Sequence, residues 1–121
     1  MIQPQELRIG NYYQGASRGN IETVTWKTLR DLSEGKLNLL PIPLTEEILL
    51  KFGFYFEEGF YCLRINNTAF MTIILHGSYV NYELSNFRQK IVFSSGEFSG
   101  VHQLQNLYFH LKGEELAFKK D

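Results

Sequence analysis

The sequence has few of the residues that would signal a disulfide scaffold, a metal-dependent nuclease or a polyanion-binding protein. Its single cysteine, Cys62, excludes an internal disulfide and favours a reducing compartment. Only Asp31 and Asp121 accompany the glutamates, so the chain is short of the acids that such nucleases gather. A net charge of −1 at pH 7 supplies no long-range attraction for DNA, RNA or an anionic membrane.

Long apolar runs are also missing. No stretch approaches the roughly 18 apolar residues of a membrane span. Residues 1–6 lack the basic region and the apolar core of a signal peptide. We therefore expect a cytoplasmic protein that does not engage a membrane.

What the chain has in abundance is aromatic residues. Ten Phe, seven Tyr and one Trp make up 15% of its 121 residues, a length that predicts one domain over residues 1–121. In so small a domain the rings cannot all be fully buried, and exposed Tyr or Phe is a feature that interfaces favour. The alternative is an aromatic-rich core with half-buried rings.

In the N-terminal half, capping and turn residues mark the ends of short helices and strands. Residues 7–13 alternate as a strand, with residues 21–24 as its hairpin partner. Thr25 is placed to cap a helix that reaches Leu32, in which Trp26, Leu29 and Leu32 repeat every three residues before Gly35. Thr45 is placed to cap a second helix over 46–52, which Gly53 ends.

The C-terminal half predicts an antiparallel meander followed by a helix. Strands are expected at residues 54–56, 61–65, 70–75, 79–84 and 90–93. Val101, Leu104, Leu107 or Tyr108, and Leu111 form one helical stripe that Gly113 closes, and residues 114–118 predict an edge strand. The expected class is α+β: an antiparallel β-meander with an N-terminal hairpin and two to three short helices packed on one face.

No group of reactive side chains has the spacing of a catalytic or metal site. His102 and His110 are eight positions apart, too far on one helix to converge on an ion, and His76 precedes a turn glycine. Cys62 lies within a predicted strand, without the flanking signals of a thiolate nucleophile. We therefore expect no catalytic residue, no metal and no cofactor. A hydrolase would need Cys62 within about 4 Å of a histidine, a looser reach than a catalytic hydrogen bond.

A polar stripe on the last helix is the candidate recognition surface. Gln103, Asn106 and His110 follow one another at i, i+3 and i+7. The alternative is an ordinary solvated helix face.

Three blocks of the sequence resemble a known family. They are LRIGNY at 7–12, PIPLTEEILLKFGF at 41–54, and VHQLQNLYF at 101–109 followed by GEEL at 113–116. Together they resemble a family of small uncharacterised proteins of bacterial chromosomes, prophages and related mobile elements. The resemblance implies a cytoplasmic accessory protein of a phage-like element.

These observations leave two functions open. The first is a non-catalytic protein-interaction module that binds a protein partner through exposed rings and the polar stripe, with a homo-oligomer as one form of partner. The alternative is a weak nucleic-acid-binding accessory protein, because basic side chains alternate with aromatic ones at Phe87, Arg88, Lys90 and Phe93. A contiguous basic groove lined with rings would favour the second function, and dispersed charges would reject it.

Overall fold

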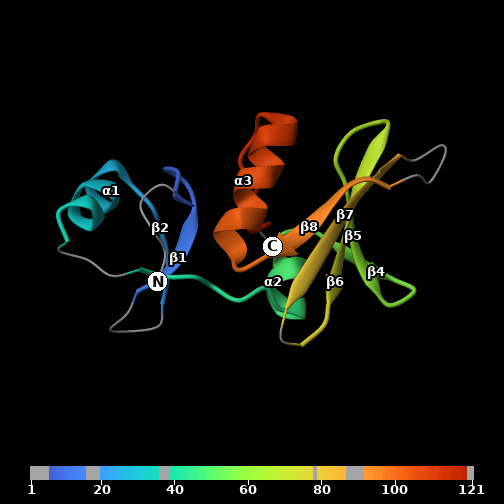
Figure 1. Cartoon of the computed structure of the whole chain (residues 1–121), viewed down its shortest axis with the longest axis horizontal. Coiled ribbons are helices and arrows are strands. Elements are labelled where there is room, and N and C mark those ends of the chain that lie inside the picture. Colours follow the sequence, from blue (N-terminus) through green and yellow to red (C-terminus); the bar gives the residue numbers. More distant parts are fainter. Residues whose placement is uncertain (1–5, 16–19, 36–38, 78, 87–91, 120–121) are drawn as a thin grey trace.

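In the part of the chain that the computed structural model describes, the residues form two antiparallel sheets and three helices (Figure 1). It describes residues 6–15, 20–35, 39–77, 79–86 and 92–119. The first sheet has the strand order β2-β1-β3 and the second has the order β4-β5-β6-β7-β8. The elements are β1 (Tyr12–Gly15), β2 (Ile21–Thr23), α1 (Trp26–Ser33), β3 (Leu39–Leu40), α2 (Glu46–Lys51), β4 (Tyr55–Glu57), β5 (Phe60–Arg64), β6 (Ala69–Leu75), β7 (Val80–Asn86), β8 (Val92–Phe98) and α3 (Val101–Lys112). The predicted α+β class is confirmed, with its N-terminal hairpin and its meander.

The small sheet and α1 share a core of their own. The buried residues of this small core are Tyr13, Val24, Leu32 and Leu39. As predicted, Thr25 caps α1, because its Oγ1 accepts the Thr28 N–H at 3.3 Å while the Thr28 hydroxyl accepts the Thr25 N–H at 3.1 Å.

The apolar repeat in α1 does not form a single buried stripe. Trp26 is 64% exposed, whereas Leu32 is buried. Side chains three positions apart on a helix differ by about 60° in direction. Apolar residues that recur every three positions therefore rotate off the buried face after two repeats. Trp26 lies over the guanidinium of Arg30 instead, with 5.0 Å between the guanidinium carbon and the ring centre.

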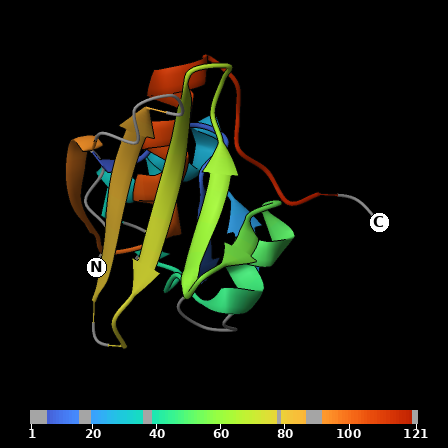
Figure 2. The same cartoon turned by 90° about the vertical axis from the view of Figure 1, so that its right-hand side faces the viewer.

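The large sheet has one face against helices and one face open. In Figure 2 the five strands face the viewer, and α3 lies behind them. The strand register shows which side chains share a face of the sheet. Tyr61 is opposite Ile73, which is opposite Tyr82, and this row packs in the larger hydrophobic core of the molecule, which we call the large core. The neighbouring row, with Cys62 opposite Thr72, points the other way. Tyr61 and Leu63 therefore pack towards the core, whereas Cys62 and Arg64 face the other side of the sheet.

The last strand is longer than the sequence predicts. Strand β8 continues to Phe98, although Ser94, Ser95 and Gly96 are poor strand formers and were expected to lead into the helix. Pairing along the whole of β7 supplies the stabilisation that local propensity lacks. Gly96 fits because the Tyr82 ring occupies its side-chain space: a Cβ there would lie 2.9 Å from Tyr82 Cε1. The predicted start of this strand, residues 90–91, lies outside the described residues.

Helix α3 stands between the two sheets (Figure 1). Val101, Leu104 and Tyr108 are buried in the large core, as predicted, and the helix ends at Gly113 with φ +73°. Leu111 departs from the predicted stripe, because it is 37% exposed in the last turn, beyond the end of the packed face.

The predicted edge strand at residues 114–118 is wrong. This segment has no strand pairing, and its backbone bonds to other elements instead. The Leu116 carbonyl accepts from Gln105 Nε2 at 3.0 Å, and the Phe118 N–H donates to the Tyr12 hydroxyl at 3.2 Å. Because these partners are side chains, the segment is held in place without joining a sheet.

Candidate functional site

The predicted polar stripe on α3 does not form one surface. Gln103 Oε1 accepts the Ser99 N–H at 2.6 Å, so this side chain closes the start of the helix. Asn106 turns into a polar junction with the N-terminal segment, and His110 is exposed near the end of α3. The helix therefore sends these three side chains to three different surroundings.

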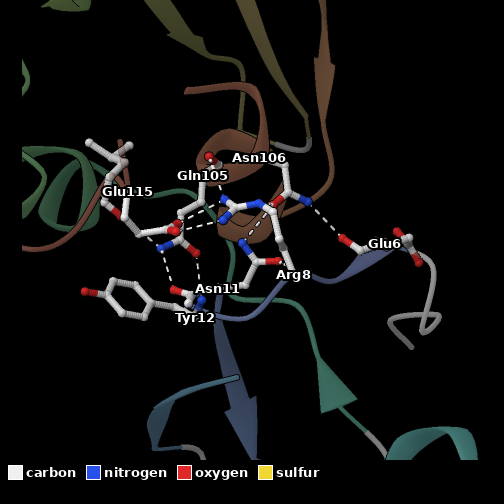
Figure 3. Close-up of polar contacts among 9 residues, drawn as sticks. Glu6, Arg8, Asn11, Tyr12, Gln105, Asn106 and Glu115 are labelled. Carbon is white, nitrogen blue, oxygen red and sulfur yellow. Dashed lines mark hydrogen bonds and ion pairs between the residues drawn. The ribbon is translucent and has the colours of Figure 1, made fainter. Parts of the chain in front are cut away.

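The polar junction connects the N-terminal segment to α3 and to the segment that follows it (Figure 3). We define it as Arg8, Asn11, Gln105, Asn106 and Glu115. Arg8 is at its centre. Its guanidinium donates to both oxygens of the Glu115 carboxylate, at 2.7 and 2.9 Å, and its Nε donates to Asn106 Oδ1 at 3.1 Å. Its planar group also lies over the Phe109 ring, 4.1 Å from the centre.

The amides of the junction are buried and matched to backbone groups. Gln105 and Asn11 are each 0% exposed. Gln105 Oε1 accepts the Tyr12 N–H at 2.6 Å, and its Nε2 reaches the Leu116 and Gly10 carbonyls at 3.0 and 3.4 Å. Asn11 accepts the Arg8 N–H at 2.6 Å and donates to Asn106 at 2.8 Å. Such paired amides set the position of β1 on α3, which is a structural role.

His102 is buried beside this junction. It is 1% exposed, and its Nε2 is 3.5 Å from Glu6 Oε1, beyond a good hydrogen bond. Burial lowers the pKa of the His102 imidazole, against the opposing effect of the Glu6 carboxylate, so the ring is neutral at pH 7. Gly100 permits this packing: a Cβ there would lie 2.8 Å from Pro41 Cβ and 3.1 Å from His102 Nδ1.

A different surface carries the exposed rings. We call the outer face the side of the large sheet that is opposite α2 and α3 (Figure 2). Near the β4–β5 hairpin it is hollowed by a pocket of about 300 Å³. Three rings and two carboxylates are among the side chains that line it. The full lining is Tyr55, Glu57, Glu58, Phe60, Cys62, Phe70 and Thr72.

The pocket is an open feature built by cross-strand neighbours. Tyr55 is 47% exposed and Phe60 is 42% exposed. Tyr55 is opposite Cys62 in the register, and Glu57 is opposite Phe60. The outward positions of the hairpin therefore bring two rings and a carboxylate together. The sequence predicts a strand at residues 61–65, but nothing local shows that Tyr55 and Phe60 share one face of the sheet or that this face stays uncovered.

Cys62 lies at the floor of this pocket as a protonated thiol. Burial raises its pKa, and the Glu57 carboxylate raises it further, against a weak contact with the Thr72 hydroxyl at 3.9 Å. Burial raises the pKa of Tyr55, and the charges of Cys62 and Glu57 raise it further, against the opposing charge of Arg64. No histidine lines the pocket among the residues that the structure describes.

The outer face is acidic. Glu57, Glu83 and Glu97 occupy outward positions of β4, β7 and β8, and Glu58 is in the hairpin turn. Arg64 also points outward, where its guanidinium donates to the Asn66 carbonyl and to Asn67 Oδ1, each at 3.2 Å. Carboxylates dominate this face within the described chain.

The basic and aromatic residues of the nucleic-acid alternative form no groove that the structure describes. Phe87, Arg88 and Lys90 lie outside the described residues. Tyr82 faces the core, where its ring stacks on Phe98 at 4.5 Å.

Among the described residues, no group of three or more His, Cys, Asp or Glu side chains is placed to hold a metal ion. Within the same residues, no helix has the length and apolar character needed to cross a membrane.

Comparison with known proteins provides no family assignment. No family model matches the chain, and neither a curated protein nor a solved structure matches it. The function of the chain is therefore inferred from its polar junction and its outer face.

Proposed function

We propose that this chain is a non-catalytic protein-interaction module and that the outer face of its large sheet is the contact surface. The observation that carries the proposal is the pocket beside the β4–β5 hairpin, where Tyr55 and Phe60 remain more than two-fifths exposed. Rings held half-exposed on a rigid sheet bury a large area when a partner binds, at little entropic cost. A sheet with one helix-free face provides such a platform.

The chemistry of the described residues supports a binding role over a reaction. The Cys62 thiol has a raised pKa, so little thiolate forms at neutral pH. His102 is buried on α3 beside the polar junction, 3.5 Å from Glu6, and does not line the pocket. Glu57 and Glu58 are sequence neighbours on one hairpin. A general base must lie within hydrogen-bond reach of the proton that it removes, and no histidine lines the pocket among the described residues.

Affinity capture from cell extracts, compared between two matched ring variants, tests the proposal. Phe60→Thr removes an outer-face ring and keeps a residue with strand propensity. Trp26→Ser removes the exposed ring of α1, away from that face. We expect proteins bound by the parent chain to be retained by Trp26→Ser and lost with Phe60→Thr. Capture that is unaffected by Phe60→Thr, or that depends on Trp26 alone, would contradict the proposal.

A further inference from the structure

We propose that the pocket on the outer face receives the cationic side chain of a lysine or arginine from a partner protein. The inference depends on the proposed function and adds the chemical class of the contact. The pocket combines the rings of Tyr55 and Phe60 with the carboxylates of Glu57 and Glu58. Aromatic faces attract a cation through their quadrupole, and adjacent carboxylates add a direct charge interaction.

Size and shape fit one side chain rather than a small-molecule cofactor. A volume of about 300 Å³ is at the lower limit of ligand sites in proteins, and this pocket is open to solvent. A long aliphatic stem could pack along the rings while its charged end reaches the turn at Glu58.

The negative charge of the outer face favours a basic protein segment over the other possible partners. A second copy of the chain, docked on the same face around a two-fold axis, would bring the carboxylates of both copies together. A nucleic acid or an anionic lipid surface would meet the same repulsion from Glu83 and Glu97. A basic protein segment is the partner whose charge complements this face.

Selection from a library of random short peptides displayed against the whole chain tests the inference. We expect the enriched peptides to contain lysine or arginine next to apolar residues. Their affinity should fall about tenfold in the double variant Glu57→Gln, Glu58→Gln and should weaken with added salt. Glu114→Gln is the matched control, since this exposed carboxylate follows α3 and lies outside the pocket.

The failures of the two proposals are distinguishable. Enriched peptides that depend on Phe60 but show no excess of basic residues would overturn the cationic ligand and leave the interaction surface standing. Binding that is unchanged in the double variant would have the same meaning. An absence of enriched peptides, or stronger binding of oligonucleotides than of any peptide, would overturn the inference as well.

Discussion

The polar junction and the outer face both combine charged groups with aromatic rings, yet they use them in opposite ways. At the junction, the Arg8 guanidinium is matched to the Glu115 carboxylate and to Asn106 within the chain. On the outer face, the Glu57 carboxylate and the Phe60 ring surround an open pocket. The difference teaches that polarity alone does not mark a recognition surface. What matters is whether the fold has already satisfied the polar groups.

The largest expected effect concerns the junction. Gln105→Ala should lower the free energy of unfolding by about 3 kcal/mol, because the Tyr12 N–H and the Leu116 carbonyl would lose their buried partner. Urea denaturation followed by circular dichroism measures this loss. His110→Ala is the control on the same helix and should change the free energy by less than about 0.5 kcal/mol. Equal effects of the two changes would show that the junction is not structural.

The second largest expected effect on stability comes from overpacking the inner face of the large sheet. Gly96→Ala should lower the free energy of unfolding by about 2 kcal/mol, because the new methyl group would meet the Tyr82 ring at 2.9 Å. Ser95→Ala, at the exposed neighbouring position, should cost much less. A neutral Gly96→Ala would mean that the Tyr82 ring moves aside freely and that β8 is not fixed by this contact.

The outer-face ring should matter more for binding than for stability. Phe60→Thr should cost about 1 kcal/mol of stability, since the ring is only partly buried, but should weaken peptide binding about tenfold or more. Thermal unfolding and a binding titration on the same samples separate the two quantities. Retained affinity in a folded variant would remove this face from the account.

The pH dependence of stability should report on His102. Its pKa is lowered in the folded state, so the unfolded chain binds a proton more readily. The free energy of unfolding should therefore be unaffected by the protonation of His102 above about pH 6.5. It should fall as the pH drops below that value towards the lowered pKa. Denaturation at several pH values measures the slope. His102→Gln should flatten this slope relative to the parent chain.

The smallest expected effect is on thiol reactivity. At pH 7.5 the Cys62 thiol should react with iodoacetamide more slowly than the same thiol in urea, because burial and Glu57 keep it protonated. The gap between the two rates should narrow as the pH rises past the raised pKa, and the difference that remains reports the limited access to the buried sulfur. A thiol that reacts faster in the folded chain would point to an activated cysteine and would reopen the hydrolase interpretation.

The sequence predicted the elements whose signals are local, and missed what depends on contacts between distant segments. Thr25, Thr45 and Gly113 marked their helix ends correctly because caps act within one turn. The extension of β8 was missed because pairing with β7 overrides the weak propensity of its residues.

The candidate site also depends on contacts between segments that are distant in the sequence. Asn106 has the spacing of a surface stripe, but Arg8, which is 98 positions away in the chain, takes its oxygen as a partner. Tyr55 lies in a predicted strand and Phe60 directly precedes the next one, yet only the completed fold shows which side of the sheet α2 and α3 cover. A pattern can assign residues to a face, but the packing of distant elements decides whether that face is buried.

The most direct test of the account is amide chemical-shift mapping of the isotope-labelled chain while a selected basic peptide is added. We predict that the shifts concentrate on the outward positions of β4, β5 and β6, around Cys62 and Thr72. Shifts that concentrate on α3 at Gln103, Asn106 and His110 would contradict the account, because they would return recognition to the helix and leave the outer face without a role.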